Sequence, residues 1–90
     1  MNKNNQPICK ISKYRTKRWI LNGKLHREDG PAVEYANGYK AWYFHDQYHR
    51  EDGPAIEYAG GFKDWYYHGQ RINCDSQEEF NRLIKLKALW

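Results

Sequence analysis

Apolar and polar residues alternate along much of this chain in short runs, and each run ends at a pair of turn-forming residues. Alternation of this kind predicts β-strands with one buried face, because successive side chains of a strand point to opposite sides of the sheet. Glycine-containing pairs favour two-residue hairpin turns, whose central residues need a positive φ. Turn pairs stand at Asn22-Gly23, Asn37-Gly38, His45-Asp46, Gly60-Gly61 and His68-Gly69. The pattern therefore predicts an antiparallel, up-and-down β-meander.

The meander is predicted to be built from one repeated unit of 23 residues. Residues 19–41 and 42–64 agree at 13 positions, and the string His-Arg-Glu-Asp-Gly-Pro-Ala occurs in both. A partial third copy, 65–73, begins at Trp65, so the array holds about two and a third units. The chain then divides into a basic N-terminal arm (1–18), a sheet of hairpin repeats (19–73) and a C-terminal capping segment (74–90).

Hairpins with two-residue loops determine which residues should lie opposite one another. In the first repeat they place His26 opposite Trp19 and Val33 opposite Trp42, and the same pairs recur 23 residues later. Since side chains alternate between the faces of a sheet, one face is expected to carry tryptophans, histidines and Val33. The other face is expected to gather tyrosines and arginines, namely Tyr43, Tyr48, Tyr66, Arg27 and Arg50.

The C-terminal segment changes from alternation to helical spacing. Phe80, Leu83 and Ile84 recur at the intervals of an amphipathic helix, and Ser76 and Glu79 have the spacing of a capping box. We expect a helix of about 12 residues whose apolar stripe packs on the Trp/Val/Ile face of its own sheet, as a cap on an open array, or on a second protomer. The predicted fold class is mainly β (α+β): a β-meander with one C-terminal α-helix.

Charge is distributed unevenly between the arm and the repeats. Residues 1–18 carry six cations and no acid, whereas residues 19–75 carry six cations against nine acids. The basic isoelectric point of about 9.1 therefore comes from the arm. A basic arm can bind nucleic acid, although a charge run of this length is often simply solvated.

Cysteine use and hydropathy bear on the compartment. Cys9 and Cys74 are far apart in sequence and form neither a disulfide framework nor a Cys-x-x-Cys pair. We expect free thiols in a reducing compartment. No apolar run approaches the length needed to cross a bilayer, and the first residues lack the apolar core of a signal peptide. The expected location is the cytoplasm, without membrane contact.

The repeated string contains residue types that can perform acid–base chemistry. His26 and His49 each precede an arginine and two acids, but a 23-residue period separates them along a sheet, and no metal-ligand spacing is present. We interpret both as partly buried histidines with one backbone hydrogen bond. Asp29 and Asp52 precede glycine, where aspartate usually accepts backbone amides. With no nucleophile–base constellation, we expect a non-enzymatic protein without metal or cofactor.

The repeat W-x-x-N-G-K-x-H-R-E-D-G-P-A-x-E-Y-A-N-G resembles tandem repeats of uncharacterised proteins in bacteriophages and giant viruses. The run SQEEFNRLIKLKALW looks like the tail of the phage members. The 23-residue hairpin unit is also similar to MORN repeats, which form meandering sheets and mostly serve as binding or scaffolding platforms. It departs from them in placing Arg-Glu-Asp-Gly-Pro where a MORN unit is rich in glycine. The resemblance implies a phage-type accessory protein that binds a host protein or signal in the host cytoplasm.

At some positions the first copy has an aliphatic residue where the later copies have one that can stack or form hydrogen bonds. Ile20 corresponds to Tyr43 and Tyr66, and Leu25 corresponds to Tyr48. We therefore expect the ligand site in the second and third copies. The first hypothesis is that the protein counters host antiviral defence by sequestering a nucleotide-derived signal. Its seven ligand-binding residues would be Tyr43, Tyr48 and Tyr66, which stack on a base or ribose, and Arg27, His45, Arg50 and Arg71, which contact phosphates.

Two other binding functions stay open. The face of tyrosines and arginines could hold a host protein, since both residue types are common interface anchors. The basic arm could bind nucleic acid. A homo-oligomer is compatible with each hypothesis, because a dimer interface could close the ligand site.

Overall fold

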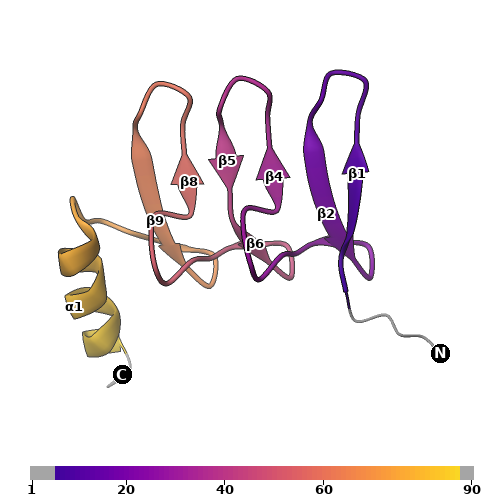
Figure 1. The fold of residues 1–90 in the computed structure, drawn as a ribbon. Helices are drawn as coiled ribbons and strands as arrows, with labels where there is room; N and C mark the ends of the chain where they lie inside the picture. The colour runs from indigo at the N-terminus through magenta and orange to yellow at the C-terminus, as the bar shows by residue number, and fades with distance from the viewer. Residues whose placement is uncertain (1–5, 88–90) are drawn as a thin grey trace.

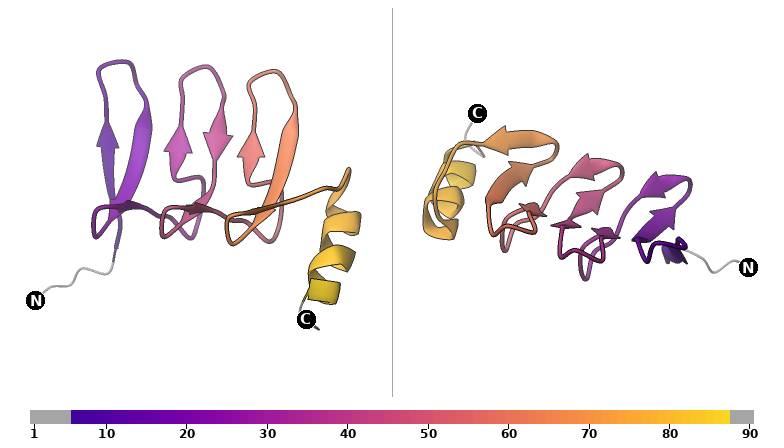
Figure 2. Two further views of the ribbon diagram at one scale, coloured as in Figure 1. Left: turned by 180° about the vertical axis from the view of Figure 1, so that it is seen from behind. Right: turned by 90° about the horizontal axis from the view of Figure 1, so that it is seen from above.

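The structure is a computed structural model, which describes residues 6–87. It shows an antiparallel β-meander followed by one C-terminal helix, as the sequence predicts (Figure 1). The protein is thin, with principal extents of 39 × 36 × 16 Å. Seen from above, the hairpins form one layer, and the helix stands at the C-terminal end of the row (Figure 2). Both broad surfaces of the sheet are thus available for contacts.

The strands are short and follow one another closely along the chain. They are β1 (Ile8–Ile11), β2 (Lys17–Leu21), β3 (Lys24–Leu25), β4 (Val33–Glu34), β5 (Lys40–Ala41), β6 (Tyr43–Phe44), β7 (Gln47–Tyr48), β8 (Ile56–Glu57), β9 (Lys63–Tyr67) and β10 (Gln70–Ile72). The sheet has the order β1-β2-β4-β5-β8-β9-β10, with β3 paired to β2. Strands β6 and β7 pair separately as a two-stranded ribbon.

Three upper hairpins recur with one loop geometry: β1–β2, β4–β5 and β8–β9 (Figure 1). Arg15, Gly38 and Gly61 stand 23 residues apart in these loops, with φ of 66°, 102° and 99°. The segment Ile8–Ile11 therefore belongs to a first structural unit that sequence identity does not reveal. The domain boundary that we predicted at residue 18 therefore does not separate an arm from the sheet. Much of the basic arm is part of the sheet, as β1 and the start of β2.

The upper loops are one residue longer than predicted. The Tyr35 amide donates to the Tyr39 carbonyl at 2.9 Å, which leaves three residues in the loop and places Gly38 in the left-handed region. Val33 consequently pairs with Ala41 instead of Trp42. Since a shift of one residue exchanges the two faces, the predicted grouping of tryptophans with Val33 was wrong. The same correction holds one unit later, where Ile56 pairs with Asp64 instead of Trp65.

The lower hairpins have the predicted two-residue turns. Asn22, His45 and His68 have φ of 53°, 51° and 48°, and the residue after each also has a positive φ, as a type I′ turn requires. The His26 amide donates to the Trp19 carbonyl at 3.0 Å. The predicted pairing of these two residues is therefore confirmed. The corresponding bond joins His49 to Trp42, also at 3.0 Å.

The core consists of two small clusters instead of one. Val33, Ala41 and Ile56 form the first, at the centre of the sheet. Trp65, Ile72 and Phe80 form the second, where helix α1 (Gln77–Lys87) covers the last unit. Of the three tryptophans that recur once per unit, Trp65 is buried in this second cluster, whereas Trp19 and Trp42 are half-buried.

Helix α1 packs on its own chain and covers the C-terminal end of the array. The Ser76 hydroxyl accepts the Glu79 amide at 3.1 Å, as the capping box predicts, while the Glu79 carboxylate accepts the amide of Asp75 at 3.0 Å. The predicted cap is thus present, and its contact is with Trp65 and not with Val33 or Ile56.

Two further features bear on the compartment. Cys9 and Cys74 are both free, the first exposed and the second half-buried. Within residues 6–87, no helix is both long and apolar enough to cross a membrane.

Candidate functional site

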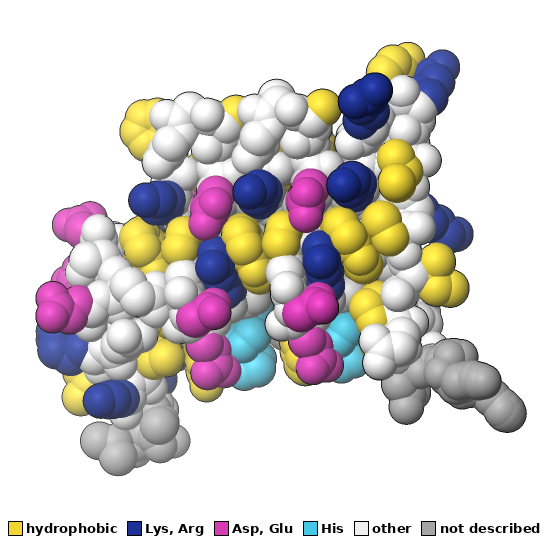
Figure 3. Space-filling model, viewed as in Figure 1, with side chains coloured by type: hydrophobic (Ala, Val, Ile, Leu, Met, Phe, Trp, Pro, Cys, Tyr) yellow, Lys and Arg dark blue, Asp and Glu magenta, His cyan; other side chains and the backbone are white. Residues whose placement is uncertain are grey.

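One broad face of the sheet carries a row of alternating charge, visible as blue and magenta side chains across the strands in Figure 3. Strand pairing places acids and bases directly opposite one another in the order Lys17, Glu34, Lys40, Glu57 and Lys63. We call this surface the charged face. Opposite charges in facing positions help to fix the register of the strands, although exposed pairs of this kind contribute little stability.

Arg27 lies on the charged face and is engaged on all sides. Its guanidinium carbon stands 3.8 Å from the ring centre of Trp19. Its Nε donates to Asp29 at 2.9 Å, and its Nη1 donates to the Pro31 carbonyl at 3.1 Å and to Glu34 at 3.5 Å. Only 21% of the side chain is exposed. These contacts indicate a structural role for Arg27 instead of the predicted phosphate contact.

Arg50 repeats the arrangement one unit later. It lies 3.8 Å from the Trp42 ring centre and donates to Asp52 at 2.9 Å, to Pro54 at 3.1 Å and to Glu57 at 3.1 Å. The aspartates of the repeated string therefore accept arginine and not the backbone amides that we expected. All of these partners lie in the same 23-residue copy as their arginine, so the duplicated contacts stabilise each unit from within.

The glycine of the repeated string is explained by the same arginine. A Cβ on Gly30 would lie 2.8 Å from Cζ of Arg27, and one on Gly53 would lie 2.5 Å from Cζ of Arg50. Neither glycine has a positive φ. Glycine is needed here for the close approach of a guanidinium and not for an unusual backbone angle.

The two repeated histidines link successive units. Nδ1 of His26 accepts the His45 amide at 3.0 Å, and Nδ1 of His49 accepts the His68 amide at 2.8 Å. Nε2 of His26 lies 3.3 Å from the Glu28 carboxylate. Because Nδ1 must be an acceptor, the proton of the neutral ring is on Nε2. The predicted backbone hydrogen bond is confirmed for both histidines. His49 is partly buried as expected, whereas His26 is fully buried.

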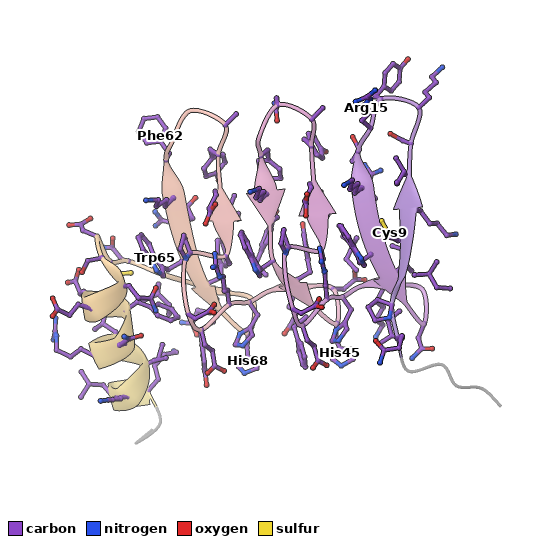
Figure 4. The ribbon with its side chains drawn as sticks, in the orientation of Figure 1. Cys9, Arg15, His45, Phe62, Trp65 and His68 are labelled. Atoms are coloured by element: carbon purple, nitrogen blue, oxygen red, sulfur yellow. The ribbon has the colours of Figure 1, made fainter. Side chains whose placement is uncertain are left out.

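His45 and His68 stand in the lower turns of neighbouring units (Figure 4). The His45 ring lies 4.3 Å from the ring of His26, and the His68 ring stacks on His49 at 4.0 Å. Burial lowers the pKa of His49, and the neighbouring His68 lowers it further. The predicted ligand residue His45 therefore contributes to a stack of imidazoles at the edge of the sheet.

The opposite broad face carries a row of tyrosines. The ring centre of Tyr48 lies 4.6 Å from that of Tyr43 and 4.8 Å from that of Tyr66. These rings pack against the central core cluster together with two further side chains. We call this surface the tyrosine face: Leu25, Tyr39, Tyr43, Tyr48 and Tyr66. Burial, and then the hydrogen bond with the Tyr48 hydroxyl, raise the pKa of Tyr43.

Arg71 borders the tyrosine face. It pairs with Tyr66 across β9 and β10, and its Nη2 donates to Asp64 at 3.2 Å. Asp64 also accepts the Tyr58 hydroxyl at 2.8 Å, and this bond is the main cause that raises the pKa of Tyr58. With 58% of its side chain exposed, Arg71 is accessible to a partner.

The structure does not bring the seven predicted ligand residues together. Tyr43, Tyr48, Tyr66 and Arg71 share one face, Arg27 and Arg50 belong to the other, and His45 lies in a turn. Strands β3 and β7 end at Leu25 and Tyr48, so Arg27 and Arg50 do not follow the alternation of a strand and lie over Trp19 and Trp42 instead. There they bind Glu34 and Glu57, which the longer upper loops bring to the same face.

A groove that sequence reasoning missed lies on the charged face between the first two copies of the repeated string. Its volume is about 710 Å³. Trp42, Phe44 and His49 line it, together with the segments 27–30 and 50–52. Four acids lie along it with side-chain exposures of 63% to 88%: Glu28, Asp29, Glu51 and Asp52. The duplicated acids were visible in the sequence, but their juxtaposition depends on the stacking of two units.

Comparisons with known proteins add no family. No protein-family model, curated protein or solved structure matches this chain. Among residues 6–87, no three histidines, cysteines or acids gather in a way that could hold a metal ion.

Proposed function

We propose that the protein is a non-enzymatic binding module that holds a partner protein on its tyrosine face. The observation that carries this proposal is the row formed by Tyr43, Tyr48 and Tyr66, whose rings contact one another across two units. Tyrosine supplies a large contact area with a hydrogen-bonding tip. Rings that are already packed lose little freedom on binding, which favours affinity.

Accessible polar groups at the edge of this face support the same function. Arg71 is largely exposed beside Tyr66, and arginine with tyrosine is the combination most enriched among residues that dominate binding energy. The resemblance to phage proteins directs the search to a host protein in the host cytoplasm. Two free cysteines suit a reducing compartment of this kind.

Sequestration of a nucleotide-derived signal is the rival hypothesis. A nucleotide needs cations beside its stacking surface. Arg27 and Arg50 are on the other face, each held by carboxylates. Arg71 is exposed beside the tyrosines, but its ion pair with Asp64 offsets its positive charge. The geometry thus favours a protein over a phosphate-bearing ligand on the tyrosine face.

The deciding experiment is capture from host lysate followed by reconstitution with the purified partner. Two variants, Tyr48→Ser and Arg71→Glu, are compared with wild type after circular dichroism and thermal melting have shown that each is folded. Phe62→Ala is the matched control, because Phe62 is an aromatic residue with 77% exposure in an upper loop, outside the tyrosine face.

We expect wild type and Phe62→Ala to bind the partner equally, with a loss of about tenfold or more for a folded tyrosine-face variant. Undiminished binding by both folded tyrosine-face variants would overturn the proposal. Saturable heat on mixing with a cyclic or ADP-ribose-type nucleotide, reduced by Tyr48→Ser, would favour the nucleotide hypothesis instead.

A further inference from the structure

The open groove on the charged face has an equivalent one unit later that is filled by the chain itself. Glu28 and Trp42 line the groove. The equivalent residues of the next repeat, 23 positions later, are Glu51 and Trp65. Helix α1 begins at that second place. Figure 4 shows Trp65 on the side of β9 nearest to α1, and Phe80 of the helix is buried against it.

The hydrogen bonds at the filled site are made by the side-chain carboxamide of Gln77. Oε1 of Gln77 accepts the indole N–H of Trp65 at 2.8 Å, and Nε2 of Gln77 donates to the backbone carbonyl of Glu51 at 2.8 Å. The same Nε2 also donates to Asn81 at 2.9 Å. A side-chain amide therefore bridges an indole donor of one unit and a carbonyl acceptor of the unit before it.

The open groove offers the same donor and acceptor without a bridging group. Neither Nε1 of Trp42 nor the carbonyl of Glu28 has a hydrogen-bond partner within residues 6–87. Arg50 covers a face of the Trp42 ring, and a cation on that face does not satisfy the N–H at the ring edge. Polar groups presented in pairs along an aromatic-lined groove are the usual means of orienting a ligand.

We infer that this groove binds a helix of a partner protein through one glutamine or asparagine side chain. The amide oxygen accepts from Nε1 of Trp42, and the amide N–H donates to the Glu28 carbonyl. An apolar side chain one turn further along the helix packs beside Phe44 and His49, because Arg50 already covers a face of Trp42. The template for this occupant is α1 itself.

The charges around the groove specify the helix further. Glu28, Asp29, Glu51 and Asp52 are largely exposed. These acids outnumber the two arginines nearby, which pair with Asp29, Glu34, Asp52 and Glu57. The groove therefore favours a helix with basic residues around its amide. This site is on the opposite face from the tyrosine face, so the inference is independent of the function proposed above.

The probe is a synthetic peptide with the sequence of residues 76–87, in which Gln77 and Phe80 keep their spacing. An isolated helix of this length is marginal in water, so binding is measured by NMR at peptide concentrations up to the millimolar range. The readout is the indole N–H resonance of each tryptophan in the full-length protein. We expect a saturable shift of the Trp42 resonance and no shift for Trp19, which does not line the groove.

Matched variants test the hydrogen bonds. Trp42→Phe in the protein, or Gln77→Leu in the peptide, should weaken binding about three- to tenfold, as expected for loss of one hydrogen bond. Trp19→Phe is the control, because Trp19 carries the same stacked arginine at 3.8 Å. A peptide with Glu78→Lys should bind more tightly than the original at low salt and lose that advantage at high salt.

Four outcomes would overturn the inference. The first is the absence of any Trp42 shift, and the second is an equal loss of binding for Trp19→Phe. The third is a shift of Trp65 in place of Trp42, which would show that the peptide only displaces α1. Concentration-dependent dimerisation that Trp42→Phe abolishes would assign the groove to a second copy of this chain and refute a different partner.

Discussion

The guanidinium of Arg50 lies over the Trp42 ring with 3.8 Å between its central carbon and the ring centre, and Arg27 lies over Trp19 at the same distance. The stacking of an arginine on a tryptophan explains why most residues of the repeated string are present. Asp52 and Glu57 hold the guanidinium in place, and Gly53 leaves room for it. The duplication that suggested repeated chemistry is a duplicated scaffold for one stacked arginine.

Arg50→Lys should therefore lower the free energy of unfolding by about 1–3 kcal/mol, because an ammonium cannot both stack on Trp42 and donate to several acceptors in a plane. Urea denaturation followed by tryptophan fluorescence measures the effect. Arg71→Lys is the control, since that side chain is 58% exposed; it should change stability by less than about 0.5 kcal/mol. Equal stability of the two variants would contradict the structural role of Arg50.

Gly53→Ala should destabilise the fold although no positive φ is involved. Its Cβ would lie 2.5 Å from Cζ of Arg50, so the guanidinium must leave Trp42 or the backbone must move, at a cost of about 1–3 kcal/mol. Gly60→Ala provides the comparison, because the nearest atom to its Cβ is 4.0 Å away. Thermal melting should show a lower transition for Gly53→Ala than for Gly60→Ala, and the reverse order would refute this explanation.

Phe80→Ala should detach the cap from the array. Phe80 is fully buried against Trp65 and Ile72, and truncation of a buried phenylalanine typically costs about 3–5 kcal/mol. Leu86, on the same helix but 46% exposed, supplies the control Leu86→Ala. Hydrogen exchange should show loss of protection throughout α1 in the first variant and little change in the second. Retained protection in Phe80→Ala would mean that other contacts hold the helix.

The sequence predicts the lower turns well and the upper ones less so. Asn22-Gly23 forms the two-residue turn that its residues favour, whereas Asn37-Gly38 stands in a three-residue loop because Tyr35 pairs with Tyr39. The same dipeptide suits both geometries. In the upper loop the Asn37 side chain accepts the Tyr39 amide at 3.0 Å, and the rings of Tyr35 and Tyr39 lie 5.1 Å apart. Arg15 occupies the left-handed position of Gly38, and for that reason the first unit is not recognisable from glycine spacing.

The candidate surfaces were predictable only in part. The tyrosine row was identified by comparing the copies, since Tyr43 and Tyr66 replace an isoleucine. The groove was not, because no local pattern shows that Trp42 faces the loop of the preceding unit. The role of Gln77 depends on its contacts with Trp65 and Glu51, which are distant from it in sequence. Sites formed between repeats depend on how neighbouring units stack. The sequence pattern of a single unit holds no information about that stacking.

His49 should make stability depend on pH below neutrality. Burial and His68 hold its pKa in the folded protein below the ordinary 6.5, against the opposing effect of Glu51. The unfolded chain therefore binds a proton more readily than the folded protein, and the free energy of unfolding falls as pH drops below about 6.5. Protonation of Nδ1 also removes the acceptor for the His68 amide. His49→Asn keeps an acceptor without a titrating ring, and its stability should fall less between pH 7.5 and 5.5 in urea denaturation; identical slopes would contradict the assignment.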